Sequence, residues 1–192
     1  MTYKTSLRKE KIQERDSISK KERDLAEKNT AAHFMNTYGE LDFEKVSVYF
    51  PIKNEVPTET ITSYIRDSGK KCFLPLISND LNNKEMKFSE FTSEASLVKN
   101  KFNIPESLNS SFVIASELEL VIMPLVAFDN KGYRLGMGQG YYDFTFKNFQ
   151  LNKKQVFLGL AYDFQKTESC YPERHDLKMD AVICPSGIYK FP

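Results

Sequence analysis

The chain has 192 residues, a net charge of +1 at neutral pH, and a composition that is 41% hydrophobic and 28% charged. This size is that of one ordinary globular domain with its own core, so we interpret residues 1–192 as a single domain. The near-zero net charge excludes a global electrostatic field that would draw in nucleic acid, and any anion site therefore has to be local.

Residues 1–36 predict two helices, because they are rich in charged residues and almost free of glycine and proline. The run Ser19-Lys20-Lys21-Glu22 matches a capping box, in which the serine and glutamate side chains bond backbone N–H groups at a helix start. We therefore predict one helix over residues 3–16 and a second over residues 20–37.

The two helices differ in how well they are suited to packing. Leu25, Ala32 and Met35 form an apolar stripe in the second helix. Leu7 and Ile12 are too sparse to make a core face in the first helix. We therefore expect the first helix to owe its place to something besides packing.

The next segments follow the order strand, helix, strand. Residues 46–50 are a β-branched and aromatic run, and residues 72–77 are a second apolar run. Between them we predict a helix over residues 59–67, with Thr58 as its cap and Gly69 as its C-terminal stop. This order within about 30 residues is typical of a βαβ crossover.

The rest of the chain carries further apolar runs, separated by turns and one more helix. Near-continuous apolar strands between helices imply a sheet that is covered on both faces. The predicted fold class is therefore α/β, a three-layer α/β/α domain with a mostly parallel central sheet and a small peripheral β-hairpin. The elements expected here are a hairpin strand at 85–88, an ordered loop at 102–105, strands at 118–123 and 156–162, a helix at 139–149 and a last strand at 181–184.

Cysteine usage indicates a reducing compartment, and hydropathy argues against a signal peptide or a membrane span. Cys72, Cys170 and Cys184 are an odd number at wide spacing without a CxxC pair, which argues against a disulfide framework and a zinc site. The N-terminal residues lack the apolar core of a signal peptide, and no apolar run approaches the roughly 20 residues that span a bilayer. We expect a cytoplasmic protein that is neither secreted nor membrane-spanning.

The segment 132–143, Gly-Tyr-Arg-Leu-Gly-Met-Gly-Gln-Gly-Tyr-Tyr-Asp, is the main candidate for a binding site. Its alternating glycines uncover backbone N–H groups ahead of a predicted helix, which favours phosphate oxygens, and Arg134 can contact the same phosphate. A dinucleotide fingerprint is excluded because its third glycine would fall on Tyr141, and no Gly-Lys-Ser/Thr closes a P-loop. The alternative is a tight turn whose Tyr141 and Tyr142 only pack on the sheet.

Carboxylates near this segment are candidate magnesium ligands. Asp143 lies in the first turns of the predicted helix, where it either interacts with the helix dipole or holds magnesium beside bound phosphates. The run 173–180, Glu-Arg-His-Asp-Leu-Lys-Met-Asp, precedes the last predicted strand and either completes a metal site or is a charged surface loop. His175 within it is more typical of a surface histidine than of a catalyst.

Two further positions favour ligand contacts. Glu55 follows the first predicted strand, at the sheet edge where open α/β sheets usually bind ligands. Its carboxylate can accept hydrogen bonds from the N–H groups of a heterocycle, with Phe50 against the ring. Lys4 and Arg8 are four residues apart on one face of the first helix and can reach a nucleotide phosphate. The alternatives are a loop glutamate and a solvated basic face.

Taken together, these segments resemble the 5-formyltetrahydrofolate cyclo-ligase family, whose members are also called methenyltetrahydrofolate synthetases. The resemblance runs in order over nearly the whole chain, and its most specific part is the run Arg-Leu-Gly-x-Gly-x-Gly-Tyr-Tyr-Asp. The matching positions are Lys4, Arg8, the segments 54–58, 124–129 and 132–143, the pair His175-Asp176, and the segment 179–183.

The resemblance implies an enzyme that uses ATP and Mg²⁺ to convert 5-formyltetrahydrofolate to 5,10-methenyltetrahydrofolate, with release of ADP and phosphate. A formamide is unreactive, so the γ-phosphoryl group first moves to the formyl oxygen; the neighbouring folate amine then attacks and phosphate leaves. The protein aligns two substrates and neutralises phosphate charge. We expect a monomer whose partners are these small molecules, without nucleic acid or membrane.

The resemblance also implies roles for the residues at the matching positions. Arg134 and Tyr141 would be catalytic, and Asp143 and Asp176 would hold magnesium. The backbone from residue 137 to residue 141 would lie between nucleotide and folate. The ATP contacts would be Lys4, Arg8, Arg134, Leu135, Gly136, Met137, Gly138, Gln139, Gly140, Tyr141 and Tyr142; the folate contacts would be Phe50, Glu55, Met137, Gly138, Gln139, Gly140 and Tyr141.

The chain departs from the family pattern at two points. Met137 and Gln139 stand where other members often carry arginine, lysine or glycine, so these side chains lack a charge although the backbone cradle is kept. The chain has no tryptophan, whereas some relatives stack one near the folate, and Phe102 is the candidate substitute. The rival functions are a sugar-phosphate isomerase or CoA-transferase-like enzyme, and a non-enzymatic nucleotide- or folate-binding module.

Overall fold

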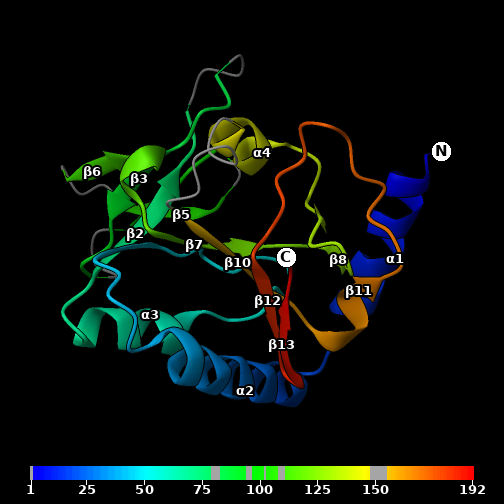
Figure 1. Ribbon diagram of the computed structural model, residues 1–192, viewed down its shortest axis with the longest axis horizontal. Coiled ribbons are helices and arrows are strands. Elements are labelled where there is room, and N and C mark those ends of the chain that lie inside the picture. Colours follow the sequence, from blue (N-terminus) through cyan, green and yellow to red (C-terminus); the bar gives the residue numbers. More distant parts are fainter. Residues whose placement is uncertain (1, 79–82, 94–96, 102, 108–110, 148–154) are drawn as a thin grey trace.

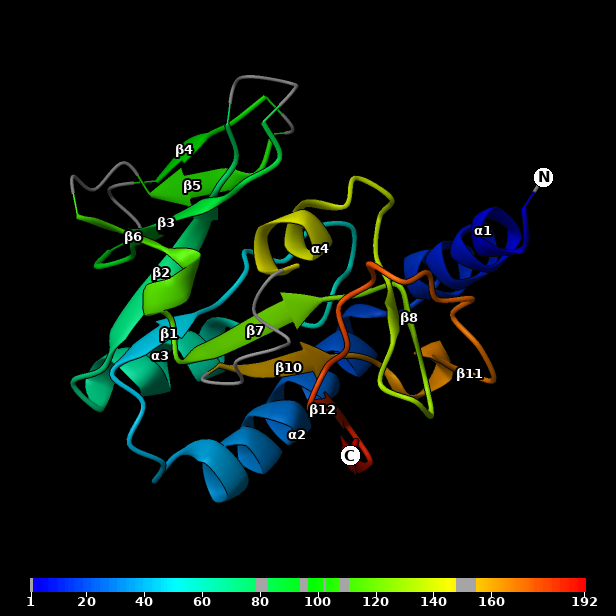
Figure 2. The same cartoon turned by 45° about the horizontal axis from the view of Figure 1, so that its top comes forward.

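The computed structural model of the chain describes residues 2–78, 83–93, 97–101, 103–107, 111–147 and 155–192. These residues form a mostly parallel central sheet with helices on both faces (Figure 1 and Figure 2). The helices are α1 (Tyr3–Asp16), α2 (Lys20–Tyr38), α3 (Glu59–Asp67) and α4 (Tyr141–Phe146), with 3₁₀ turns η2 (Ala115–Glu117) and η3 (Asp163–Gln165).

The strand order of the central sheet is β13-β12-β10-β7-β1-β2-β3-β6, and two small sheets accompany it, β11-β8-β9 and β4-β5. Strands β12, β10, β7, β1 and β2 are parallel, whereas β13, β3 and β6 pair antiparallel at the edges. The bounds are β1 (Lys45–Ser47), β2 (Lys71–Leu76), β3 (Lys87–Glu90), β4 (Leu97–Lys99), β5 (Pro105–Ser107), β6 (Phe112–Ile114), β7 (Leu120–Pro124), β8 (Ala127–Asp129), β9 (Arg134–Leu135), β10 (Val156–Leu160), β11 (Lys166–Thr167), β12 (Ala181–Cys184) and β13 (Gly187–Lys190).

The side chains of β7 show why the sheet is covered on both faces. Leu120 and Ile122 belong to the core that α2 and α3 cover, whereas Val121 and Met123 belong to the core that α4 covers. Alternate residues of a strand point to opposite faces, and all four side chains are fully buried. The predicted three-layer α/β/α arrangement is therefore confirmed, and so is the βαβ unit, because β1 and β2 pair in parallel around α3.

Helix caps locate the helix boundaries closely. Ser19 and Glu22 form the predicted capping box at the start of α2, and α1 and α3 have the predicted bounds. Thr58 precedes α3 as predicted, but its hydroxyl donates to the Tyr49 carbonyl at 2.9 Å and makes no cap bond. Gly69 follows α3 with a φ of 75°, the left-handed geometry of a helix stop.

The buried face of α2 differs from the predicted stripe. Leu25 is 55% exposed and Ala32 is exposed, so the stripe prediction was wrong for these two residues, whereas Met35 is partly buried and packs against the core. Phe34 anchors the helix instead, with its ring 6.4 Å from that of Tyr64 on α3. Aromatic side chains at helical spacing outweighed the scattered aliphatic ones. The buried residues that follow one another at intervals of four along α2 are Ala26, Thr30, Phe34 and Tyr38.

The edges of the sheet were predicted less well than its centre. The strand expected in a peripheral hairpin at 85–88 is β3, which pairs with β2 in the central sheet, and the small hairpin is β4-β5. Strand β13 follows the strand that was expected to be last. Helix α4 begins two residues later than predicted; the end of the predicted helix and Phe102 lie outside the described residues.

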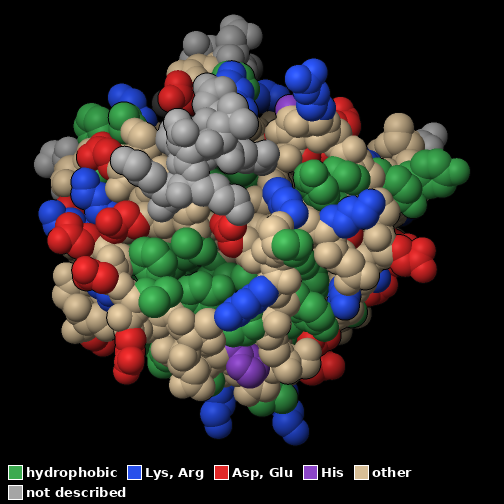
Figure 3. Space-filling model, viewed as in Figure 1, with side chains coloured by type: hydrophobic (Ala, Val, Ile, Leu, Met, Phe, Trp, Pro, Cys, Tyr) green, Lys and Arg blue, Asp and Glu red, His purple; other side chains and the backbone are tan. Residues whose placement is uncertain are grey.

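The surface and the cysteines agree with the composition. On the face that Figure 3 shows, acidic and basic side chains are interspersed. The three cysteines all lie in described ranges, where they are buried and unpaired. No helix in the described part of the chain has the length and apolar character needed to cross a membrane.

Gly159 in β10 leaves no room for a methyl group. An added Cβ would lie 2.7 Å from Leu125 Cδ2 and 2.8 Å from Met179 Sδ, and both side chains are buried. We expect Gly159→Ala to lower the free energy of unfolding by about 1–3 kcal/mol through overpacking, as measured by urea denaturation. Gly136→Ala is the control, because its Cβ would meet no atom within 4 Å; equal urea midpoints for the two variants would contradict the prediction.

Candidate functional site

A cavity of about 870 Å³ opens at the carboxyl ends of the parallel strands. Its wall contains Phe50, Ile77 and Leu125, which follow β1, β2 and β7. The strand order reverses between β1 and β7, since later strands are added on both sides of β1. Such a switch point is where open α/β sheets usually bind ligands.

All of the predicted site residues line this cavity. They come from four parts of the chain: α1, the loop after β1, the glycine loop with the start of α4, and the loop before β12. The structure thus brings the predicted residues together, while their individual roles remain predictions. They are Lys4, Arg8, Phe50, Glu55, Arg134, Leu135, Gly136, Met137, Gly138, Gln139, Gly140, Tyr141, Tyr142, Asp143 and Asp176.

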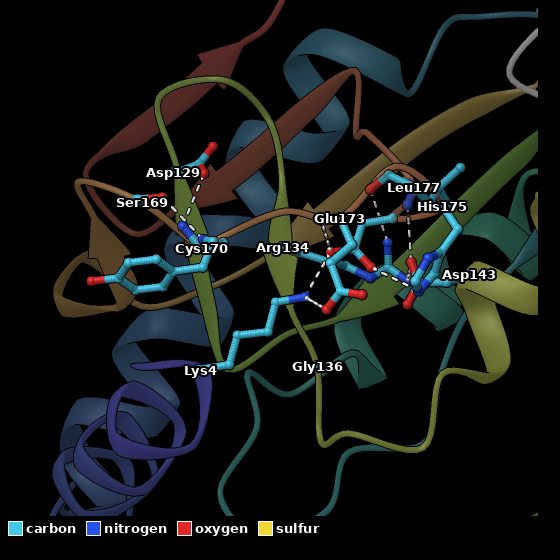
Figure 4. Close-up of polar contacts among 12 residues, drawn as sticks. Lys4, Asp129, Arg134, Gly136, Asp143, Ser169, Cys170, Glu173, His175 and Leu177 are labelled. Carbon is cyan, nitrogen blue, oxygen red and sulfur yellow. Dashed lines mark hydrogen bonds and ion pairs between the residues drawn. The ribbon is translucent and has the colours of Figure 1, made fainter. Parts of the chain in front are cut away.

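Asp129 builds the turn that delivers the chain into the glycine loop. Its Oδ1 accepts the N–H groups of Lys131 and Tyr133 at 2.9 and 3.1 Å, and its Oδ2 accepts the Cys170 N–H at 3.0 Å (Figure 4). The side chain is almost fully buried, so β8 and β9 are held in register by a carboxylate with several donors. Asp129 was not among the predicted site residues, although a carboxylate at the end of an apolar run is a signal that the sequence carries.

Two glycines of the loop adopt a geometry that other residues rarely take. Gly138 and Gly140 have φ angles of 92° and 73°, in the left-handed region that favours glycine. Arg8 lies directly against the loop, because its Nε donates to the Gly136 carbonyl at 2.8 Å. The first helix therefore contacts the glycine loop through a predicted phosphate ligand.

Arg134 ties three walls of the cavity together. Its Nη1 donates to the Leu177 carbonyl at 3.2 Å and its Nη2 to Asp143 Oδ1 at 3.0 Å (Figure 4). The same Asp143 oxygen accepts the Leu177 N–H at 3.0 Å. Strand β9, helix α4 and the loop before β12 are thus linked by one buried guanidinium.

Lys4 joins the start of α1 to the loop before β12. Its Nζ donates to Glu173 Oε1 at 2.9 Å and to Asp176 Oδ2 at 3.0 Å. Burial works against the charge on Lys4, but the hydrogen bonds to the two carboxylates outweigh it and raise the pKa of the ammonium group. The His175 side chain is 68% exposed, in keeping with a surface histidine.

Tyr141 and Tyr142 agree with both interpretations of the segment 132–143, namely a ligand-binding loop and a turn whose tyrosines pack on the sheet. Both rings pack against the core beneath α4, and both line the cavity. The Tyr142 hydroxyl is buried and has no hydrogen-bond partner among the described residues. Burial raises the pKa of this hydroxyl well above its ordinary value, so the group stays protonated and can donate.

Asp143 and Asp176 are the predicted magnesium ligands, and both line the cavity. Asp143 Oδ1 is paired with Arg134 and Asp176 Oδ2 with Lys4, and Asp176 Oδ1 lies 3.7 Å from His175 Nε2. The described residues contain no group of three or more candidate metal ligands. Magnesium is commonly held by one or two carboxylates together with phosphate oxygens and water, so the oxygen donors of these two side chains suit it chemically.

Glu55 is buried at the carboxyl edge of β1, and its surroundings shift its titration. Oε2 accepts the Ile52 N–H at 3.0 Å, while Arg15 Nη1 lies 3.8 Å from Oε1. Burial raises the pKa of Glu55 from its ordinary value of 4.5 to about 7, although the Ile52 N–H and the charges of Arg15 and Lys53 oppose the rise. Arg15 was not predicted to lie here, because an arginine near a helix end usually lies in solvent.

These features define an α/β protein with a cavity at the switch point of its sheet, lined by cations, carboxylates and a glycine loop. The chain belongs to the 5-formyltetrahydrofolate cyclo-ligase family, whose family model matches residues 1–185. The predicted family is therefore confirmed, and with it the assignment of the chain to a family of ligases.

Individual relatives agree with this assignment. The chain is 34% identical to 5-formyltetrahydrofolate cyclo-ligase of Escherichia coli (strain K12) over 148 residues, covering 76% of this chain and 80% of the relative. It is 31% identical to the Haemophilus influenzae protein of that name over 160 residues, covering 82% and 84%. The solution structure of 5,10-methenyltetrahydrofolate synthetase from Aquifex aeolicus is similar, with a TM-score of 0.83, 27% identity, and 98% and 93% of the two chains covered.

The raised pKa of Glu55 makes folding stability depend on pH. The folded state favours the neutral acid form of Glu55. The contribution of this neutral side chain to folding stability is therefore complete below pH 4.5 and is lost as pH rises through about 7. We expect the free energy of unfolding of the wild type, relative to that of Glu55→Gln, to fall by about 3 kcal/mol over this interval. Urea unfolding of both proteins at about pH 4.5 and about pH 8 measures it; parallel pH profiles would show that Glu55 does not titrate there.

Proposed function

We propose that the chain catalyses the ATP- and Mg²⁺-dependent conversion of 5-formyltetrahydrofolate to 5,10-methenyltetrahydrofolate, with release of ADP and phosphate. The observation that carries this proposal is the meeting, around one cavity, of the predicted cations, glycine loop, carboxylates and pterin contacts from four separate parts of the chain. The names of the relatives support the same substrate class.

The nucleotide side of the cavity lies between α1 and the glycine loop. Lys4 and Arg8 face the cavity from α1, and Arg8 is bonded to the Gly136 carbonyl. In the proposal these two cations and the uncovered N–H groups of residues 136–140 hold the triphosphate. Met137 and Gln139 contribute through their backbone, because neither side chain carries a charge.

The folate side of the cavity lies at the end of β1. Glu55 presents a carboxylate that is ionised in part at neutral pH, and such a group accepts hydrogen bonds from the N–H groups of a pterin. Phe50 supplies an apolar wall for the ring. In the proposal the backbone from Met137 to Tyr141 lies between the two substrates and holds them against each other.

The proposed chemistry needs alignment and charge neutralisation and no protein nucleophile. The γ-phosphoryl group passes from ATP to the formyl oxygen, the neighbouring folate amine attacks the formyl carbon, and phosphate leaves with that oxygen. Arg134 offsets the negative charge of the phosphoryl group in transfer, and Tyr141 lies beside it at the start of α4. Asp143 and Asp176 hold the magnesium ion, which supplies further charge neutralisation when bound.

The alternatives make different demands. A sugar-phosphate isomerase or a CoA-transferase-like enzyme has no use for magnesium carboxylates, and the relatives are cyclo-ligases. A non-enzymatic module would bind nucleotide or folate without turnover. The proposal also keeps the predictions of a monomer, of a cytoplasmic location, and of small molecules as the partners without nucleic acid or membrane.

Mixing the purified protein with 5-formyltetrahydrofolate and MgATP tests the activity directly. We expect the absorbance of the methenyl product to rise, with one ADP released per product, and no rise when ATP is left out. Binding of either ligand without an ATP-dependent change in absorbance would favour the non-enzymatic alternative and refute the proposal.

Asp143→Asn tests the metal role without removing the hydrogen-bond acceptor that Arg134 and Leu177 use. We expect magnesium-dependent turnover to fall by about a hundredfold or more, because the amide lacks the charge that magnesium requires, while circular dichroism shows an unchanged fold. Asp24→Asn is the control, since Asp24 is exposed on α2 and pairs with Lys20. Turnover in the Asp143 variant at the control level would rule out the metal assignment.

A further inference from the structure

Arg15 is a buried cation that none of the predicted roles uses. It lies in the last turn of α1, with 1% of its side chain exposed. Its Nη1 lies 3.8 Å from Glu55 Oε1 and 3.4 Å from the Leu125 carbonyl oxygen, and its Nη2 lies 4.0 Å from Met137 Sδ. Its Nε is buried without a hydrogen-bond partner in the described part of the chain.

These contacts are too long to offset the desolvation of a buried charge. Strong charge-assisted hydrogen bonds are about 2.7–2.9 Å long, and the Leu125 carbonyl already accepts from Gln165 Nε2 at 2.8 Å. An apolar side chain of similar volume would fill the same space without the cost of desolvation. Stability alone therefore does not account for an arginine at this position.

The surroundings of Glu55 show what the buried cation does. Glu55 Oε2 is held by the Ile52 N–H, which leaves Oε1 on the side of Arg15. The tyrosine hydroxyls nearby are neutral, because burial raises the pKa of each of them, and Lys53 is exposed. Arg15 is thus the buried charge that opposes protonation of Glu55. The titratable groups that face Glu55 are Arg15, Tyr49, Lys53, Tyr142 and Tyr162.

Arg15 also lies on the same face of α1 as the predicted nucleotide contacts Lys4 and Arg8. It lies seven residues after Arg8, which is two turns of an α-helix, so it shares a face with Arg8 and Lys4. The first two of these cations along the chain line the cavity, and the third lies behind its wall against Glu55 and Met137. One face of α1 therefore carries both the cations that line the cavity and the cation that lies against Glu55.

We propose that Arg15 is a positioning residue of the folate site, which keeps Glu55 charged and oriented toward a pterin and seats Met137 of the glycine loop beside it. The inference rests on the proposed function, because it takes the pterin contact of Glu55 from it. It accounts for the weak apolar face of α1, since this helix serves both substrates through its cations.

The test compares Arg15→Met with Arg15→Lys. The dissociation constant of 5-formyltetrahydrofolate is measured by calorimetric titration without ATP, across pH. In Arg15→Met we expect folate binding to be weaker by about tenfold near pH 7. We also expect the pH at which binding weakens on acidification to move upward by about one unit, because Glu55 loses the cation that opposes its protonation. The urea midpoint should not fall. In Arg15→Lys, binding should stay within about threefold of the wild type, with its pH profile.

Lys11→Met is the matched control on the same helix. Lys11 pairs with Glu10 and Glu14 and makes no contact with Glu55, so folate affinity and its pH profile should stay those of the wild type. Unchanged folate binding in Arg15→Met, loss of its fold, or weakened binding in Arg15→Lys equal to that in Arg15→Met would each overturn the inference alone. A wild-type protein that binds no 5-formyltetrahydrofolate would overturn the proposed function as well.

Discussion

The guanidinium of Arg134 is the interaction on which the cavity depends. It bonds the Leu177 carbonyl and the Asp143 carboxylate, and Asp143 in turn bonds the Leu177 N–H. Because Arg134 is buried, truncation of the Asp143 side chain would leave this guanidinium without its side-chain hydrogen-bond acceptor inside the protein. The glycine segment is thus anchored before and after its left-handed residues, and its backbone is presented to the cavity between two fixed points.

The centre of the fold could be predicted from the sequence because its physical signals are local. Strands that are buried on both faces have continuous apolar sequences, as in β7. Helix starts can be recognised from capping residues such as Ser19 and Glu22. The edges could not be predicted in the same way. In the described part of the chain, strand β13 pairs only with β12 at one margin, and β3 pairs antiparallel with β2 and β6 near the other. The buried face of α2 depends on the contact between Phe34 and Tyr64 of another helix.

The candidate site could be predicted wherever a residue type and a spacing carry the chemistry. Lys4, Arg8 and the glycine segment belong to this group, and the structure gathers them around one cavity. Arg15 and Leu177 could not be found in this way. The first matters through burial next to Glu55, and the second through backbone atoms that any residue would supply. Both properties arise only from the tertiary structure.

The contacts of Lys4 span almost the whole chain, because the lysine meets residues 169 and 172 positions away. During synthesis on the ribosome, α1 is made early, yet Lys4 lacks these two carboxylate partners until Glu173 and Asp176 have been translated. These contacts of Lys4 can therefore form only after nearly the whole chain has been made. A ligand that bridges these two regions would bind finished chains and leave nascent ones unrecognised.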